Sequence, residues 1–256
     1  MGSVAPARHP HIMLSKQPWH MVATRLEAFL LSHEDAREFS QKLAQATKRV
    51  CEDYKVGDVE YEEPFSDQLC GRLKETLVDF QSPHIDWQAD VATEGRGRGR
   101  LRGRTLKKTT EEPLFGADIV MTIDVDTPEY KTRKGFLVQS KRLEVGQAIA
   151  SSEHKRLVDQ CEKMLRVTPA SMVFLYSVNG VAVLPATAVL ATQHRRLNEV
   201  ATYEIEWLFH DFAICWFGDP LLQATDSLSL EGLRYRMDAD AAVRFVGHAK
   251  PGLDRT

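Results

Sequence analysis

Two short runs of apolar and β-branched residues lie near the middle of the chain, separated by a polar segment. The first run covers residues 116–124 and the second covers residues 135–142. Runs of this composition predict β-strands, and the intervening residues 126–131, which include a proline, predict a turn. We therefore expect an antiparallel hairpin centred near Pro128 and Glu129.

A hairpin with this centre brings three polar side chains together at one end. Asp118 falls opposite Gln139, and Gln139 shares a strand face with Lys141 at a spacing of roughly 7 Å. A carboxylate, an amide oxygen and an ammonium group are thus predicted to meet there. Asp124 has the same parity as Asp118 but lies about 20 Å further along the strand. We expect Asp124 and Asp126 to be charges that face solvent.

The segments around the hairpin predict an α/β fold. An amphipathic stripe of apolar residues predicts a helix before the hairpin, and an alternating segment predicts a first strand. A second helix, a strand buried on both faces and a short last strand follow the hairpin. In order, the predicted helix, strand, helix and two strands around the hairpin cover residues 65–80, 85–91, 152–167, 171–177 and 181–185.

Helical patterns dominate both ends of the chain. They cover residues 19–31 and 34–51 before this core, and residues 189–197 and 199–217 after it. We expect an N-terminal helical extension (1–60), a core (61–190) and a C-terminal helical extension packed on the core (191–256). The N-terminal helices serve either as packing elements or as a surface for a partner.

Composition narrows the functional classes. The 256 residues are 43% hydrophobic and 27% charged with a net charge of −3, which is typical of a globular protein without an overall basic surface. The four cysteines form no CxxC pair, so we expect a reducing, cytoplasmic environment rather than disulfides or a zinc site. There is no apolar run of membrane-spanning length and no apolar signal segment, so we expect no membrane association.

One segment departs from this average. Residues 94–108 carry seven basic residues and one acid among several glycines. Arginine binds phosphate groups through two parallel hydrogen bonds, so this segment predicts contact with a nucleic-acid backbone. It has no aromatic residue for base stacking, and a solvated insertion without a partner is the alternative. The predicted contacts are Arg96, Arg98, Arg100, Arg102, Arg104, Lys107 and Lys108.

The motifs Gly116-Ala117-Asp118 and Gln139-Ser140-Lys141, in this order of elements, resemble the PD-(D/E)xK nuclease superfamily. The resemblance is to its Mrr-like variant, in which glutamine replaces the second acid. It covers residues 62 to about 190 and departs at Ala117, where the family has proline. It implies a restriction-endonuclease-like core, an α-βββ-α-ββ mixed sheet flanked by helices.

The resemblance also implies a metal site. Asp118, Gln139 and the backbone carbonyl near Ser140 would hold Mg²⁺ or Mn²⁺, and Lys141 would position the attacking water.

In the family, a glutamate on the helix before the first strand joins this site. Glu62 or Glu63 matches that place, with Glu62 favoured because it lies one turn before Phe65 and leans toward the buried face. Alternatively, both acids only cap the helix. A polar residue on the second helix can also face the site, and Gln160 matches it; the alternative is a hydrogen bond at the edge of the core.

The expected activity is Mg²⁺-dependent endonucleolytic hydrolysis of DNA with little sequence specificity, as in restriction or anti-phage defence effectors. A partner sensor or activating protein would supply the trigger, and a homodimer would supply two sites for a double-strand cut. The alternatives are a catalytically weak module that binds nucleic acid or scaffolds a defence complex, and an enzyme that acts on RNA.

Overall fold

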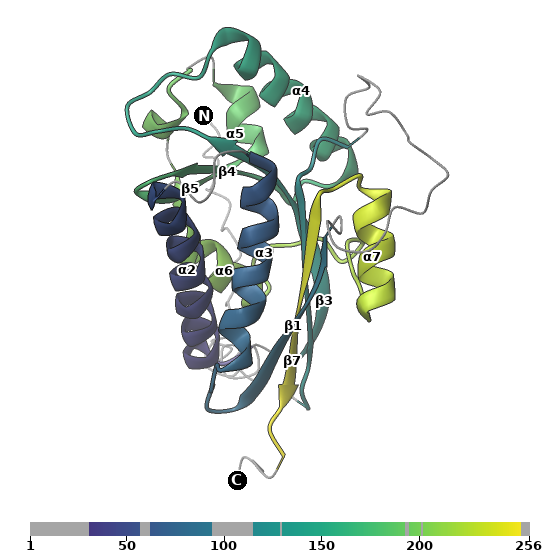
Figure 1. Cartoon of the computed structure of the whole chain (residues 1–256). Coiled ribbons are helices and arrows are strands. Elements are labelled where there is room, and N and C mark those ends of the chain that lie inside the picture. The colour runs from purple at the N-terminus through teal and green to yellow at the C-terminus, as the bar shows by residue number, and fades with distance from the viewer. Residues whose placement is uncertain are drawn as a thin grey trace, which may run out of the picture.

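The computed structural model describes residues 31–56, 62–93, 115–128, 130–192, 195–200 and 202–251. Its strands are β1 (Ile85–Thr93), β2 (Ile119–Asp126), β3 (Lys131–Arg142), β4 (Ser171–Ser177), β5 (Gly180–Pro185), β6 (Tyr203–Glu204) and β7 (Ala241–Ala249). They form one seven-stranded mixed sheet in the order β1-β7-β2-β3-β4-β5-β6. The protein is therefore an α/β fold built on a single sheet (Figure 1).

Helices cover both faces of the sheet. They are α2 (His33–Val56), α3 (Glu62–Val78), α4 (Ser151–Val167), α5 (Ala186–Ala191), α6 (Ile205–Ala213) and α7 (Ser227–Arg236), with a short 3-10 helix at Leu197–Glu199. Buried side chains of α2, α3 and α6 share one apolar cluster with the strands. Those of α4, α5 and α7 share a second cluster. The sheet thus lies between two helical layers (Figure 1).

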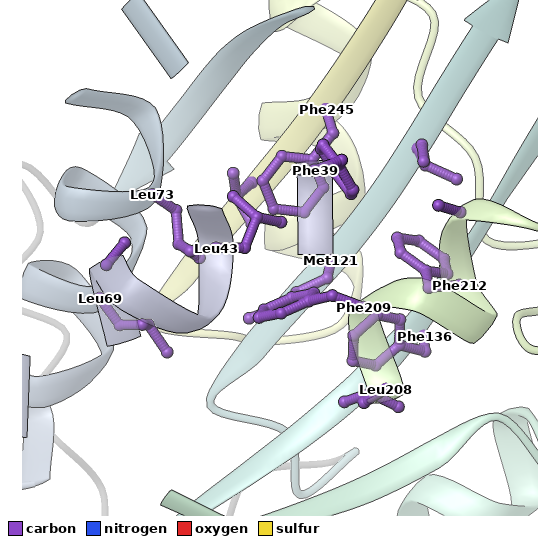
Figure 2. Close-up of a cluster of buried hydrophobic side chains, with 14 of the residues drawn as sticks. Phe39, Leu43, Leu69, Leu73, Met121, Phe136, Leu208, Phe209, Phe212 and Phe245 are labelled. Atoms are coloured by element: carbon purple, nitrogen blue, oxygen red, sulfur yellow. The ribbon is translucent and has the colours of Figure 1, made fainter. Parts of the chain in front are cut away.

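The first cluster is the larger one, and it draws on distant parts of the chain. Figure 2 shows Phe39 of α2 and Leu73 of α3 beside Phe209 of α6, over strand residues such as Met121 and Phe245. Ile119 of β2 belongs to the first cluster, and the next residue, Val120, belongs to the second. Both faces of β2 are covered, which explains its nearly continuous apolar sequence.

The predicted hairpin register is confirmed. Ile119 pairs with Val138 and Asp126 pairs with Lys131, so the same register places Asp118 opposite Gln139. The predicted order of helix, three strands, helix and two strands is also found, as α3, β1, β2, β3, α4, β4 and β5.

The C-terminal part was expected to be helical throughout, and it is not. Its last strand, β7, lies inside the sheet, antiparallel to β1 and parallel to β2. The expected helix 189–197 is replaced by the end of α5 and a 3-10 turn, and the expected helix 199–217 is shortened to α6 after a two-residue strand. The apolar pattern did not indicate β7 because Arg244 interrupts it.

The expectation that Asp124 faces solvent is wrong. Asp124 is 4% exposed and accepts hydrogen bonds from Arg133 Nε (2.8 Å) and from Arg244 (2.6 Å), which β7 contributes. Arg244 also pairs with Asp90 at 3.0 Å, so one ionic network joins four strands. The expectation for Asp126 is confirmed, since its exposed carboxylate pairs with a lysine at the hairpin turn.

Several expectations fall outside the described residues. These are the helix at 19–31 and the basic segment at 94–108. The helix predicted at 34–51 corresponds to α2, and α2 is longer than the prediction. Among the helices of the described ranges, none has the length and apolar character that crossing a bilayer requires.

Candidate functional site

Asp118 and Gln139 are in direct contact. The side-chain amide of Gln139 donates a 2.6 Å hydrogen bond to Oδ2 of Asp118. The backbone N–H of Ser140 donates to the same oxygen at 2.8 Å. The backbone N–H of Asp118 in turn donates to the carbonyl of Val138, which continues the hairpin ladder by one residue. The carboxylate is therefore held in place by two donors from β3.

The glycine before this aspartate is required by the fold. Gly116 has a φ of +67°, and a Cβ atom at this position would lie 2.7 Å from the backbone oxygen of Gln160 on α4. The chain thus turns tightly against α4 immediately before Asp118, with Ala117 buried between them. This contact brings the backbone of Gln160 next to the segment that enters the site, and the Gln160 side chain is itself buried.

Gln139 has a buried side-chain oxygen that accepts no hydrogen bond from the described residues. Its Nε2 donates to Asp118 and, at 3.2 Å, to the carbonyl of Ser140. Its Oε1 is buried and has no hydrogen-bond partner in the described part of the chain. An unpaired buried acceptor costs roughly 1–3 kcal/mol, and a cation removes that cost. Carboxylate and amide oxygens are also the donors that Mg²⁺ and Mn²⁺ take in proteins, so this pair fits the expected ion.

Lys141 forms an ion pair that the sequence did not suggest. Its Nζ lies 2.5 Å from Oε2 of Glu153 in the first turn of α4, with the lysine side chain 12% exposed and the glutamate 41% exposed. The hydrogen bond from Lys141, together with its charge, lowers the pKa of Glu153. Strand alternation places Asp118, Gln139 and Lys141 on the face that α4 covers.

Glu153 is thus a second carboxylate beside the predicted residues. The helix that carries it was predicted from residue 152, and acids are common in first helical turns because of the helix dipole. Nothing in its spacing connected it with Lys141. Only the packing of α4 on β3 brings the two together.

The expected helix acids begin α3, at the same end of the sheet. Phe65 of α3 stacks on Tyr176 with ring centroids 3.9 Å apart, and Tyr176 pairs with Arg142, the neighbour of Lys141. However, the buried residues of α3 belong to the apolar cluster on the opposite face.

The side chains of Glu62 and Glu63 themselves lie outside the described residues, as do the basic residues 96–108. Within the described ranges, no three histidine, cysteine, aspartate or glutamate side chains gather at a common point. Among the described residues, the oxygen atoms that could bind a metal ion at the candidate site are those of the Asp118 carboxylate, the Gln139 amide and the Ser140 carbonyl. The carboxylate of Glu153 lies next to them, bound to Lys141.

Comparison of the chain with protein-family models, with curated proteins and with solved structures gave no match in any of the three.

Proposed function

We propose that the protein is a Mg²⁺- or Mn²⁺-dependent nuclease that hydrolyses DNA phosphodiester bonds. The observation that carries this proposal is the contact of Gln139 with Asp118, which leaves a buried amide oxygen without a partner beside a carboxylate. A carboxylate and an amide oxygen side by side are suited to binding a hard cation. The order of elements around it supports the same reading.

Each residue would have a distinct role. Asp118 supplies the charged ligand and Gln139 a neutral one, with the backbone of Ser140 fixing the carboxylate. A divalent ion bound there supplies an activated water and neutralises charge on the phosphate. Lys141 contributes a positive charge for the developing negative charge of the phosphate, and Glu153 holds its ammonium toward α4 until substrate arrives.

The same ion pair favours the rival function, a module that binds nucleic acid without cutting it. If the ammonium of Lys141 stays bound to Glu153, it cannot serve a phosphate. The two readings differ in what Glu153→Gln does. In an enzyme this substitution changes the cleavage rate, whereas in a binding module it leaves an inactive protein inactive.

The deciding assay is cleavage of supercoiled plasmid with Mg²⁺ or Mn²⁺ by the wild-type chain and by Asp118→Asn and Lys141→Met. Both variants should lose cleavage and keep their fold. Lys131→Met is the matched control, because it removes a surface ion pair at the distant hairpin turn. RNA of the same sequence, assayed in parallel, tests the alternative substrate. Binding of DNA without cleavage by the wild-type chain under both metals would contradict the proposal.

A further inference from the structure

The segment that follows α6 forms an antiparallel bridge with β3 at Gly135. Gly135 and Asp219 exchange two backbone hydrogen bonds of 3.0 and 2.7 Å. Gly218 has a φ of +118°, and a Cβ there would lie 2.8 Å from Cδ of Lys134. Within this segment Cys215 has a φ of +71°, a conformation that side-chain-bearing residues rarely adopt. The backbone that carries the thiol is thus attached to β3 by the hydrogen bonds of Asp219.

Polar groups on one face of the chain surround this thiol. Tyr130, Thr132 and Lys134 alternate in sequence and therefore point to the same side. The hydroxyl of Thr132 lies 3.2 Å from the sulfur of Cys215. The hydroxyl of Tyr130 donates to the carbonyl of Ala213 at 3.0 Å and also interacts with the sulfur.

Lys134 is the unusual member of this cluster. It is 3% exposed, and its buried ammonium has no hydrogen-bond partner among the described residues other than its interaction with the sulfur of Cys215. The ammonium lies 5.2 Å from the centre of the Phe212 ring, and its charged neighbours are Cys215 and, more weakly, Asp211. Burial lowers the pKa of Lys134, and Cys215 opposes that shift. A buried ammonium needs an anion close by, and a thiolate at Cys215 would be that anion.

Cys215 differs from the other three cysteines. Burial alone would raise its pKa, but hydrogen bonds with Thr132 and Tyr130 and the charge of Lys134 outweigh burial, so the pKa is lowered. Burial raises the pKa of Cys51 to about 11 and that of Cys161 to about 12, and it also raises the pKa of Cys70. Cys215 is exposed, whereas the other three are buried.

We propose that Cys215 is a reactive thiolate, stabilised by Lys134 and Thr132, and that small peroxides oxidise it to a sulfenic acid. The thiolate sulfur attacks one peroxide oxygen, an S–O bond forms and the O–O bond breaks. Sulfur is oxidised by two electrons, and the peroxide is reduced by the same two electrons. The other peroxide oxygen leaves as hydroxide and takes a proton from the ammonium of Lys134 to become water, and solvent then reprotonates the lysine.

This site is separate from the proposed nuclease site. Lys134 and Lys141 are seven residues apart on β3, which is about 23 Å along a strand, and they point to opposite faces. Oxidation of Cys215 therefore does not depend on whether the protein cleaves DNA, and the test below uses no nuclease activity.

The test is the rate of labelling of the intact protein by iodoacetamide between pH 5 and 9, with the labelled cysteine identified by mass spectrometry. Cys215 alone should react under native conditions, because the other thiols are buried. Each unit by which a substitution raises the thiol pKa reduces the thiolate fraction, and so the labelling rate near pH 6, about tenfold. Lys134→Met should produce such a loss, and Lys134→Arg should restore part of the rate.

The peroxide step has its own readout. After exposure to hydrogen peroxide, dimedone should attach to Cys215 in the wild-type chain and much more slowly in Lys134→Met. If Lys134→Met does not fold, Thr132→Val removes a hydrogen bond to the same sulfur and should also slow labelling. Equal labelling rates at all pH values in the wild type and in Lys134→Met, or in Thr132→Val where Lys134→Met does not fold, would overturn the proposal, as would absence of the dimedone adduct.

Discussion

The amide of Gln139 donates a 2.6 Å hydrogen bond to the carboxylate of Asp118 across the β2–β3 hairpin. This contact requires a neutral donor, because a second carboxylate so close would repel the first. The glutamine therefore allows the two side chains to meet when no cation lies between them. A site built in this way keeps its shape without metal and has one negative charge fewer with which to bind it.

Gln139→Glu should make the protein depend on divalent metal for its stability. Without metal, the two adjacent carboxylates repel each other and lower the free energy of unfolding. With Mn²⁺ at about 100 times its dissociation constant, binding adds about 2.7 kcal/mol to the free energy of unfolding. Thermal unfolding with and without Mn²⁺ measures both effects, and the increase in melting temperature should be larger in the variant than in the wild type.

The matched control for that substitution is Gln88→Glu. Gln88 is exposed on β1, and its amide points at Asp86 at 3.5 Å, so the same change of charge occurs beside another carboxylate without burial. Mn²⁺ should shift the melting temperature of this control no more than that of the wild type. An equal metal response in both variants would show that Asp118 and residue 139 do not share a cation.

Gly116→Ala should disturb the site through the backbone. A methyl group there meets the backbone of α4 at 2.7 Å, and the left-handed φ of +67° adds strain of about 1–2 kcal/mol. Gly146→Ala separates the two causes, since Gly146 has a φ of +79° but no atom within 4 Å of the added methyl group. Urea unfolding should show the strain alone in Gly146→Ala and a clearly larger loss of stability in Gly116→Ala. Equal losses would contradict a tight approach of α4.

The hairpin could be predicted from sequence because its information is local. Two apolar runs and a short polar turn determine the register, and the register determines which residue faces Asp118. Glu153 could not be predicted in the same way, since its contact with Lys141 depends on how α4 packs.

The strand β7 was missed for a related reason. Arg244 breaks its apolar run, and a charged residue in a central strand is acceptable only when carboxylates from other strands pair with it. Those partners are Asp90 and Asp124, more than 100 positions away in sequence. The expectation for Asp124 was wrong for the same reason. Its partner Arg133 lies opposite it in the hairpin, but its second partner, Arg244, comes only with β7.

Arg244→Met should therefore cause a large loss of stability. The arginine is 7% exposed, and its removal leaves Asp124 buried with only Arg133 as a partner. Breaking a buried pair in this way costs about 3–5 kcal/mol. Lys131→Met breaks an exposed pair with Asp126, which solvent screens, and should change the stability little. Urea denaturation of the two variants measures the difference, and similar midpoints would show that the buried network adds little.

Asp35 should give stability that depends on acid pH. It is fully buried in α2, and burial raises its pKa. Hydrogen bonds from Ser32 and Ser82 and the interaction with His84 outweigh burial and lower the pKa below the ordinary value of an aspartate. The unfolded chain then takes up a proton more readily than the folded one, so this stability is complete above about pH 4 and is lost as the pH falls through the folded pKa.

Asp35→Asn removes that dependence. The difference in melting temperature between the wild type and this variant should be largest near pH 7 and should shrink below pH 4, because the wild-type carboxylate becomes protonated there. Asp126→Asn is the control: Lys131 lowers the pKa of Asp126 as well, but this carboxylate is exposed, so its substitution should change the melting temperature little at any pH. A difference for Asp35→Asn that stays constant from pH 7 to pH 3 would mean that its carboxylate contributes through shape and neutral hydrogen bonds rather than through its charge.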